Sequence, residues 1–410
     1  MKYFIKFSDI NEHGLNNIYN LFKNIEKFDQ CGGDNEFTTV KYDDDDTPIE
    51  VLNPSVDNDS EIEELCKDYE KIPHILPAQK RIICIGDLHG DFDLTIKCLK
   101  LAKLIDNKKP IPNWIADPPE TVVVQIGDQI DKCRPSINEP CDDPNTTPGD
   151  ESSDIKILEF FTKLNVEAAK KGGAVISLLG NHEIMNVSGN MGYVSYKGLK
   201  QFEKEKKPET NKIFKDGLEA RKYFFKQGNK YAKFMACTRQ TALIVGSNLF
   251  VHATILPQLA KQFNVTDLNI LVRKWLLNLI DDNVKVNGIA NIGDILYNYN
   301  LSPFWPRILG NLPPNVPISD DVCVDNLMET LDLYSVNNMI VGHTPQIFTK
   351  DKSGINVTCR DEVEGVNRGI WRIDVGSSSG FDNFKNEQTK ELSKPQVLEI
   401  IDDNEFNVLS

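Results

Sequence analysis

Residues 81–91 read RIICIGDLHGD, and this stretch decides the fold. The apolar run at 82–85 is short and ends at a glycine, which predicts a strand buried on both faces. Asp87 and His89 follow it, two positions apart, so on an extended backbone both side chains point the same way. Alone, this pair predicts either a cation site at the end of the strand or an ordinary surface turn, and the rest of the chain has to distinguish the two.

The same arrangement, a predicted strand followed by polar residues, occurs four more times. The apolar runs lie at 121–126, 174–179, 249–251 and 339–341. They are followed by Asp128 and Asp131, by Asn181 and His182, by His252, and by His343. Because strands of α/β sheets bring their carboxyl ends to one edge, we expect these side chains to lie together. Four of the six histidines stand at these strand ends, which favours a metal site over unrelated structural histidines.

The predicted ligands are one amide, several carboxylates and several imidazoles. Imidazole suits the borderline metals, so this set favours Mn, Fe or Zn over Ca or Mg. So many ligands predict two cations, and two metal ions about 3.5 to 4 Å apart can hold both ends of an in-line displacement and generate hydroxide near neutral pH. A single metal ion or a purely structural site is the alternative, although structural sites usually close with four ligands.

The motifs GDLHGD, GDQID, GNHE and GHTP, together with a single histidine after a strand, resemble the calcineurin-like metallophosphoesterases, and within them the phosphoprotein phosphatases. The resemblance covers about residues 78–402. GNHEIMN, the segment 193–195, SPFWPR and WRIDVG look most like the Shewanella-like, bacterial-type protein phosphatases. The resemblance implies an α/β fold, a two-sheet β-sandwich flanked by helices, and two divalent or trivalent metal ions.

The resemblance also implies roles for individual residues. Asp87 and His89 would hold the first metal, Asp128 would bridge, and Asn181, His252 and His343 would complete the second. His182 would be the general acid, oriented by Asp131, because a carboxylate behind an imidazole fixes its tautomer. The candidates for phosphate binding are Arg307, which we prefer, and Arg221, Lys132 and Arg134.

Two positions depart from the family pattern. The second motif usually continues with Arg-Gly after the aspartate, whereas Lys132 and Cys133 stand here, and lysine lacks the bidentate fork of arginine. His252 is followed by Ala253 and Thr254, where relatives commonly carry two glycines.

The chain is expected to contain an extension and one catalytic domain. Residues 1–75 predict a partly mobile N-terminal extension with an acidic run, and 76–410 predict the metallophosphoesterase domain. Residues 184–240 form a lysine-rich insertion that we expect to cap the site. Further expectations are a strand at 3–7, helices at 14–28, 61–71, 94–104, 154–171, 196–206, 215–227 and 257–282, a hairpin at 241–251, no helix at 302–318, and closing strands at 370–375 and 396–401.

Composition restricts the class of protein. The formal charge of -15 and the pI near 5.0 argue against nucleic acid as a partner. The nine cysteines lie singly with an odd total, which predicts reduced thiols in an intracellular setting. Neither a secretory leader nor a long apolar segment occurs, so we expect a soluble cytoplasmic protein without a membrane partner. Abundant Asn, Ile, Asp and Lys are typical of AT-rich genomes such as those of protists or large DNA viruses; a viral chain would act in the host cytoplasm or the virion.

Together these features predict a phosphoric monoester hydrolase whose substrates are phosphorylated proteins or peptides. The Shewanella-like resemblance favours phosphotyrosine over phosphoserine or phosphothreonine. The alternatives are a dinucleoside polyphosphate hydrolase or a nuclease of the same superfamily, and a catalytically inactive scaffold that binds phosphoproteins. A nuclease is disfavoured because Thr344 and Pro345 stand where such enzymes carry a further histidine, and a scaffold because the ligand set is intact.

Overall fold

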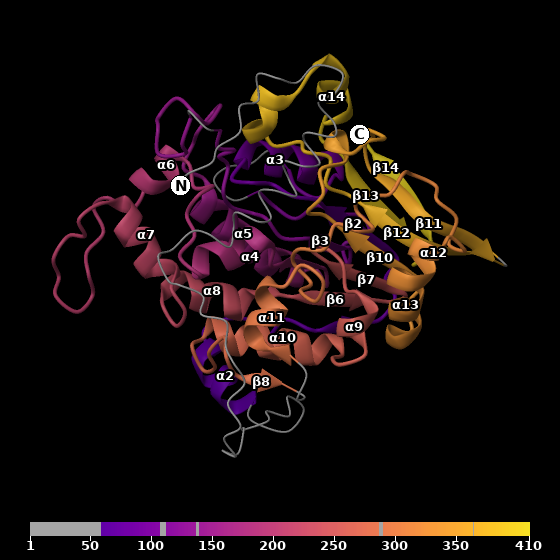
Figure 1. Cartoon of the computed structure of the whole chain (residues 1–410), viewed down its shortest axis with the longest axis horizontal. Helices are drawn as coiled ribbons and strands as arrows, with labels where there is room; N and C mark the ends of the chain where they lie inside the picture. The colour runs from indigo at the N-terminus through magenta and orange to yellow at the C-terminus, as the bar shows by residue number, and fades with distance from the viewer. Residues whose placement is uncertain (1–58, 107–111, 137–138, 287–289, 364) are drawn as a thin grey trace, which may run out of the picture.

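Two six-stranded mixed sheets form the centre of the molecule, and helices lie on their outer sides (Figure 1). The computed structural model describes residues 59–106, 112–136, 139–286, 290–363 and 365–410. The architecture is the predicted two-sheet sandwich flanked by helices, which is thereby confirmed. The strand predicted at 3–7 and the helix predicted at 14–28 lie outside the described residues.

The first sheet has the order β14-β13-β2-β3-β4-β5. Its strands are β2 (Arg81–Ile85), β3 (Val122–Gln125), β4 (Ala174–Leu178), β5 (Arg239–Gln240), β13 (Val397–Ile401) and β14 (Glu405–Leu409). The four strands β2 to β5 are parallel. Ile85 pairs with Gln125, and Gln125 pairs with Ser177, so the carboxyl ends of three strands lie level with one another.

The second sheet has the order β1-β6-β7-β10-β12-β11. Its strands are β1 (Ile75–Leu76), β6 (Ala242–Val245), β7 (Asn248–Val251), β10 (Asn338–Val341), β11 (Asn356–Val363) and β12 (Val366–Arg372). β6 and β7 form the predicted hairpin. β10 is parallel to both β7 and β12, so the residues that follow these three strands emerge at one edge.

The β2 strand shows why the two sheets stack with helices outside them. Ile82 and Cys84 face the second sheet and pack with residues such as Phe250. Ile83 and Ile85 face the other way, into a cluster formed with α3 (Phe92–Leu101) and α4 (Asp154–Ala169). Alternate residues of one strand therefore belong to two different cores, as the continuous apolar run predicts.

Helices and small sheets complete the described part of the chain. They are α2 (Asp59–Cys66), α5 (Asn181–Val187), α6 (Tyr196–Lys200), α7 (Gly217–Phe225), α8 (Lys230–Thr238), α9 (Pro257–Ala260), α10 (Val265–Leu276), α11 (Ile292–Tyr297), α12 (Asp321–Cys323), α13 (Glu329–Tyr334), α14 (Glu387–Leu392) and the pair β8 (Lys285–Val286) and β9 (Ala290–Asn291). The absence of helix from 302–318 is confirmed. Among the elements that the sequence did not predict are α5, α8, α11, α13, α14, β11 and β14, and the strand expected at 370–375 ends earlier, with β12 at Arg372.

The prediction of reduced cysteines is wrong for six of the nine. Disulfides join Cys66 to Cys237, Cys133 to Cys141, and Cys323 to Cys359. Cys84 and Cys98 are free and buried, and Cys31 lies outside the described residues. The partners of the first pair are separated by 171 positions and meet only because α2 packs on α8, so spacing could not reveal them. Since disulfides persist in oxidising surroundings, the cysteine count no longer supports a reducing compartment.

Residues 59–76 are attached to the body of the protein. The Cys66–Cys237 disulfide fixes α2, and β1 pairs with β6 in the second sheet. Among the described residues, no helix is both long and apolar enough to cross a membrane.

Candidate active site

The five predicted strand ends meet at one edge of the sandwich, and backbone hydrogen bonds join them. The amides of Leu88 and His89 donate to the carbonyl oxygen of Asp128 at 3.0 and 2.8 Å. The amide of His182 donates to Asp128 Oδ1 at 3.0 Å, and the amide of His343 donates to Asp87 Oδ2 at 3.1 Å. All the predicted metal ligands are buried: Asp87, His89, Asp128, Asn181, His252 and His343.

One half of the site is formed by Asn181, His252 and His343 around Asp128. His252 Nδ1 lies 2.8 Å from the carbonyl oxygen of Ile126 and donates to it. In the neutral ring the lone pair is therefore on Nε2, which lies 3.0 Å from Asn181 Oδ1 and 3.4 Å from Asp128 Oδ2. His343 Nδ1 lies 3.0 Å from the same amide oxygen. Several electron-pair donors thus face one another, an arrangement that fits a cation held between them.

The other half contains Asp87 and His89, again beside Asp128. His89 Nε2 lies 3.8 Å from Asp87 Oδ2 and 3.8 Å from Asp128 Oδ2. Asp128 therefore stands between the two halves. Burial, together with the charges of Asp374 and Asp128, raises the pKa of Asp87 well above its ordinary value.

Four residues of the site have a left-handed backbone. The φ angles are 43° for His89, 51° for Asp128, 69° for Asp131 and 63° for His343. This conformation costs a non-glycine residue about 1 to 2 kcal/mol, and it persists where the surrounding structure requires it. Here the hydrogen bonds that join the strand ends hold these residues in the left-handed conformation.

His182 points one ring nitrogen at Asp131 and the other towards Asp128. His182 Nδ1 lies 3.0 Å from Asp131 Oδ2, and Nε2 lies 3.8 Å from Asp128 Oδ2. Asp131 Oδ2 also accepts from Asn186 Nδ2 at 2.8 Å. Sequence reasoning missed Asn186, although it follows His182 by one turn of α5 and so shares its helix face. His89, Asp128 and His182 lie close enough together to hold an ion, so His182 is placed for a ligand role as well as for proton transfer.

Two of the four predicted phosphate-binding side chains, Arg221 and Lys132, are bound to other groups of the protein. Arg221 is fully buried and forms ion pairs with Asp131 at 3.3 Å and with Asp154 at 2.8 Å. Lys132 Nζ donates to the carbonyl oxygen of Gly149 at 2.8 Å and lies 3.3 Å from Glu151 Oε1. Their side chains are thus bound to carboxylates and to a carbonyl oxygen of the protein, and their assignment to phosphate binding stays a prediction.

The other two cations lie beside residues that contact the site. Arg134 donates through Nη1 to the carbonyl oxygens of Asp131 and Cys133 at 3.0 and 2.8 Å. Arg134 lies against the rings of Phe381 and Tyr193, with its guanidinium 4.3 and 5.8 Å from the ring centroids. Those two rings in turn pack edge-on against His89 and His182. On the other side, Arg307 Nε lies 3.0 Å from His343 Nε2.

A sixth strand end adds a carboxylate that the sequence analysis did not include. Asp374 follows β12, is buried, and accepts from the amide of Gly376 at 2.8 Å through Oδ1. Its Oδ2 has no hydrogen-bond partner among the described residues. The backbone of Ile373 and Asp374 packs on Gly86, where any side chain would collide with the Ile373 carbonyl. WRIDVG carries the signal that could have found it, a strand followed by a carboxylate.

Burial and the charge of Asp128 raise the pKa of Asp374 to about 6. Glu183 is also buried, but it accepts from the amides of Asp128, Gln129 and Gly180 at 2.9, 2.9 and 2.7 Å. Glu183 thus fixes the turns that carry the predicted ligands, whereas Asp374 keeps one oxygen available.

Comparisons with known proteins agree with this geometry. The family model described as calcineurin-like phosphoesterase matches residues 80–346. A protein of Acanthamoeba polyphaga mimivirus is 39% identical over 264 residues, which cover 61% of this chain and 98% of that protein. Shewanella-like protein phosphatase 2 of Arabidopsis thaliana is 27% identical over 362 residues, 81% of this chain and 78% of the relative. Among solved structures, the cold-active protein-tyrosine phosphatase of a psychrophilic Shewanella shares the fold, with a TM-score of 0.52 and 19% identity over 86% of this chain and 85% of that one.

Proposed function

The chain belongs to the calcineurin-like phosphoesterase family and is a phosphoric monoester hydrolase, and we propose that it is a metal-dependent phosphatase of phosphorylated proteins. The observation that carries this proposal is the position of Asp128, which stands between two groups of buried donors at one edge of the sandwich. Such an arrangement suits two cations rather than one.

We assign Asp87 and His89 to one metal, Asn181, His252 and His343 to the other, and Asp128 to both. Mn, Fe and Zn match the mixture of imidazole and oxygen donors. When bound, the metal ions would act as Lewis acids on the phosphoryl group and lower the pKa of water. The residues that would hold them are already fixed by hydrogen bonds among the strand ends.

His182 is assigned as the general acid that protonates the leaving oxygen. Its Nδ1 bonds to Asp131, which leaves Nε2 as the nitrogen that faces the site. Asp131 accepts the hydrogen bond from Nδ1 and thereby fixes the tautomer of the imidazole, and Arg221 and Asn186 hold Asp131 in place.

Arg134 and Arg307 are assigned as the phosphate-binding cations. A guanidinium can donate two parallel hydrogen bonds to a phosphate, which lysine cannot do. We assign this role to Arg134 rather than to Lys132, because the single ammonium of the lysine is bound to Gly149 and Glu151. Arg134 is held in place through Nη1, which donates to the carbonyl oxygens of Asp131 and Cys133. Arg372 supports the segment that carries Arg307, because its guanidinium donates to the carbonyl oxygens of Leu309 and Gly310, two and three residues after Arg307.

The proposed substrates are phosphoproteins, with phosphotyrosine preferred. Relatives named Shewanella-like protein phosphatases support the protein substrate. The aromatic rings of Tyr193 and Phe381, packed against His182 and His89, support the preference for an aromatic phosphoester, since rings pair favourably edge to face.

The test combines metal analysis with turnover. We expect the purified full-length protein to carry up to two equivalents of metal, to hydrolyse p-nitrophenyl phosphate, and to lose activity reversibly with a chelator. A panel of matched phosphotyrosine, phosphoserine and phosphothreonine peptides then measures the preference. Bound metal without turnover of any phosphoester would contradict the proposal and support a phosphoprotein-binding scaffold instead.

A further inference from the structure

A strongly basic lobe projects from this acidic protein. We define the lysine lobe as residues 197–233, which contain eleven lysines against five acidic residues. The whole chain has a formal charge of -15, so the lobe carries a charge opposite to that of the remainder. In Figure 1 the lobe, with α6, α7 and the chain between them, extends away from the two sheets.

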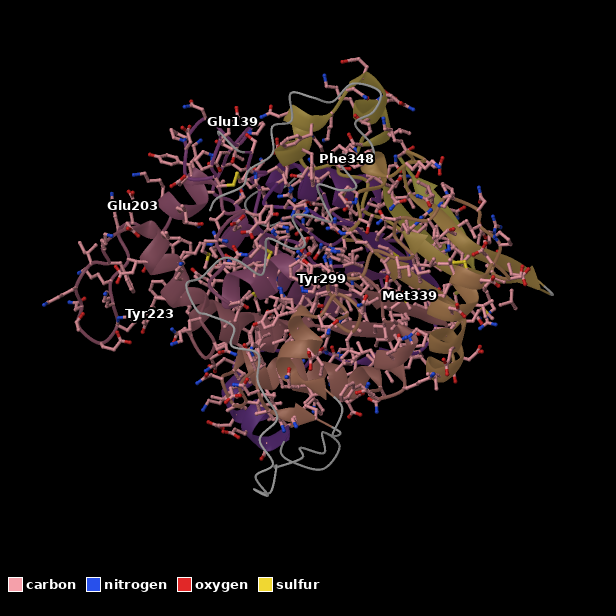
Figure 2. The ribbon with its side chains drawn as sticks, in the orientation of Figure 1. Glu139, Glu203, Tyr223, Tyr299, Met339 and Phe348 are labelled. Carbon is pink, nitrogen blue, oxygen red and sulfur yellow. A yellow bond between two sulfur atoms is a disulfide. The ribbon has the colours of Figure 1, made fainter. Side chains whose placement is uncertain are left out.

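Most of these lysines are available to a partner. Nine of the eleven are exposed: Lys197, Lys200, Lys204, Lys206, Lys212, Lys215, Lys222, Lys226 and Lys230. Among the described residues, Lys204, Lys206 and Lys212 have no ion-pair partner, whereas Lys200 pairs with Glu203. Figure 2 shows Glu203 and Tyr223 on the lobe, among side chains that point away from the body.

Contacts within the lobe fix the backbone that carries these lysines. Lys206 and Ile213 form an antiparallel bridge, which makes the segment between α6 and α7 a hairpin. The ion pair of Lys207 with Glu219, at 2.7 Å, fastens the hairpin to α7. Phe202 and Phe214 pack with Phe224 inside the lobe. The lysines are therefore held in a defined surface rather than on a solvated tail.

The base of the lobe contacts the catalytic residues. Tyr193, just before α6, packs edge-on against His182 with 4.9 Å between ring centroids. From within the lobe, Arg221 reaches Asp131 and Asp154. The lobe is therefore joined at its base to residues of the site, and a protein substrate that extends beyond the site can reach its exposed lysines.

We infer that the lysine lobe binds an acidic segment of the protein substrate next to its phosphorylated residue. This inference rests on the proposed phosphatase function. A short acidic segment gains from the local lysines, whereas an extended polyanion such as nucleic acid or a charged membrane also meets the acidic remainder of the molecule. Charge pairs of this exposed kind are individually weak, so the lobe contributes to substrate choice through several of them at once.

The test uses the full-length protein and two matched variants. The first changes Lys204, Lys206 and Lys212 to Glu. The control changes Lys97, Lys100 and Lys103 to Glu, since these lysines are exposed on and after α3 and the change in net charge is identical. Substrates are two phosphopeptides that differ only in having acidic or neutral residues beside the phosphorylated one, together with p-nitrophenyl phosphate.

We expect the first variant to lose on the order of 10-fold in kcat/KM on the acidic peptide, from several weak charge pairs. Turnover of p-nitrophenyl phosphate and of the neutral peptide should stay unchanged, and the control should resemble the wild type. The advantage of the acidic peptide should also shrink as salt rises, because exposed charges are screened. Equal losses on both peptides, or the same loss in the control, would overturn the inference.

A binding measurement tests the lysine lobe independently of whether the protein is a phosphatase. Anisotropy of a labelled, unphosphorylated acidic peptide reports on the lobe even if no phosphoester is turned over. Weaker binding by the first variant alone would support the inference. Stronger binding of anionic vesicles than of the peptide would overturn it in favour of a membrane. Peptide binding that appears only after Asp43–Asp46 are changed to Asn would overturn it in favour of the chain's own acidic run as the occupant.

Discussion

The guanidinium of Arg221 lies behind the carboxylate of Asp131, with Nη2 3.3 Å from Oδ1, although 90 residues separate the two. The same guanidinium binds Asp154 at 2.8 Å and donates through Nε to Asn186 at 2.9 Å. His182 and Asn186 occupy the other oxygen of Asp131. Arg221, one of the candidates for phosphate binding, thus contacts the carboxylate that is proposed to orient the general acid.

Replacing Arg221 by lysine should therefore lower kcat rather than weaken phosphate binding. Lysine keeps the charge but cannot bind Asp131, Asp154 and Asn186 together, and loss of such supporting partners typically costs about 10- to 100-fold in activity. Steady-state kinetics with p-nitrophenyl phosphate and inhibition by inorganic phosphate measure both effects. Retained kcat with much weaker phosphate inhibition would show that Arg221 binds phosphate after all.

Replacing Arg134 or Arg307 by alanine should have the opposite signature. Each is proposed to donate to the phosphate, and a hydrogen bond to a charged group is worth about 1.5 to 3 kcal/mol, so KM and the inhibition constant of phosphate should rise on the order of 10-fold or more. The control is Lys132→Ala, whose ammonium contacts Gly149 and Glu151. If Lys132→Ala raised KM as much as the arginine variants, the assignment of Arg134 and Arg307 to phosphate binding would be mistaken.

Asp128→Asn should reduce metal content and turnover together, by more than about 100-fold in activity, with the fold intact. The reason is that the amide removes one negative charge from the residue shared by both halves of the site. Elemental analysis and circular dichroism on the same preparation provide the measurement. Two retained metals with normal activity would exclude Asp128 as a bridging ligand.

His182→Asn should leave the metals bound and cost roughly 10²- to 10⁴-fold on phosphopeptides, the usual range for a lost proton donor. The loss should be distinctly smaller on p-nitrophenyl phosphate, whose leaving group is a weaker base and needs less help from an acid. Asp131→Asn should show the same ordering with a smaller loss, since it only changes the orientation and charge of the imidazole. An equal drop on all substrates with metal loss would identify His182 as a ligand.

Asp374→Asn should weaken metal retention, because this buried carboxylate adds negative charge beside Asp87 and keeps one oxygen free of partners among the described residues. We expect the affinity for metal, measured by competition with a chelator, to fall by about 10- to 100-fold. Asp382→Asn, at an exposed carboxylate nearby in the sequence, is the control. Unchanged chelator competition would limit Asp374 to a structural role.

Local sequence determined the strands and the polar residues at their carboxyl ends. A short apolar run that ends at glycine has few ways to fold except as a buried strand, and parallel strands must end at one edge. The sequence therefore predicted that the polar side chains at these strand ends would lie together. The structure places the following residues close to one another: Asp87, Asp128, Asn181, His252 and His343. Asp374 was not predicted as a site residue, because the strand was expected to continue to residue 375. In the structure β12 ends at Arg372, so Asp374 follows the strand.

Contacts between elements distant in sequence were decided only by the tertiary structure. Whether Arg221 faces phosphate or Asp131 depends on how α7 is rotated against α5, and no local pattern encodes that rotation. The pairing of Cys66 with Cys237 depends in the same way on α2 packing against α8. Strand ends share an edge because the backbone hydrogen bonds of a sheet leave them little choice, whereas the partner of a side chain on a packed helix is set by the sum of many weak contacts.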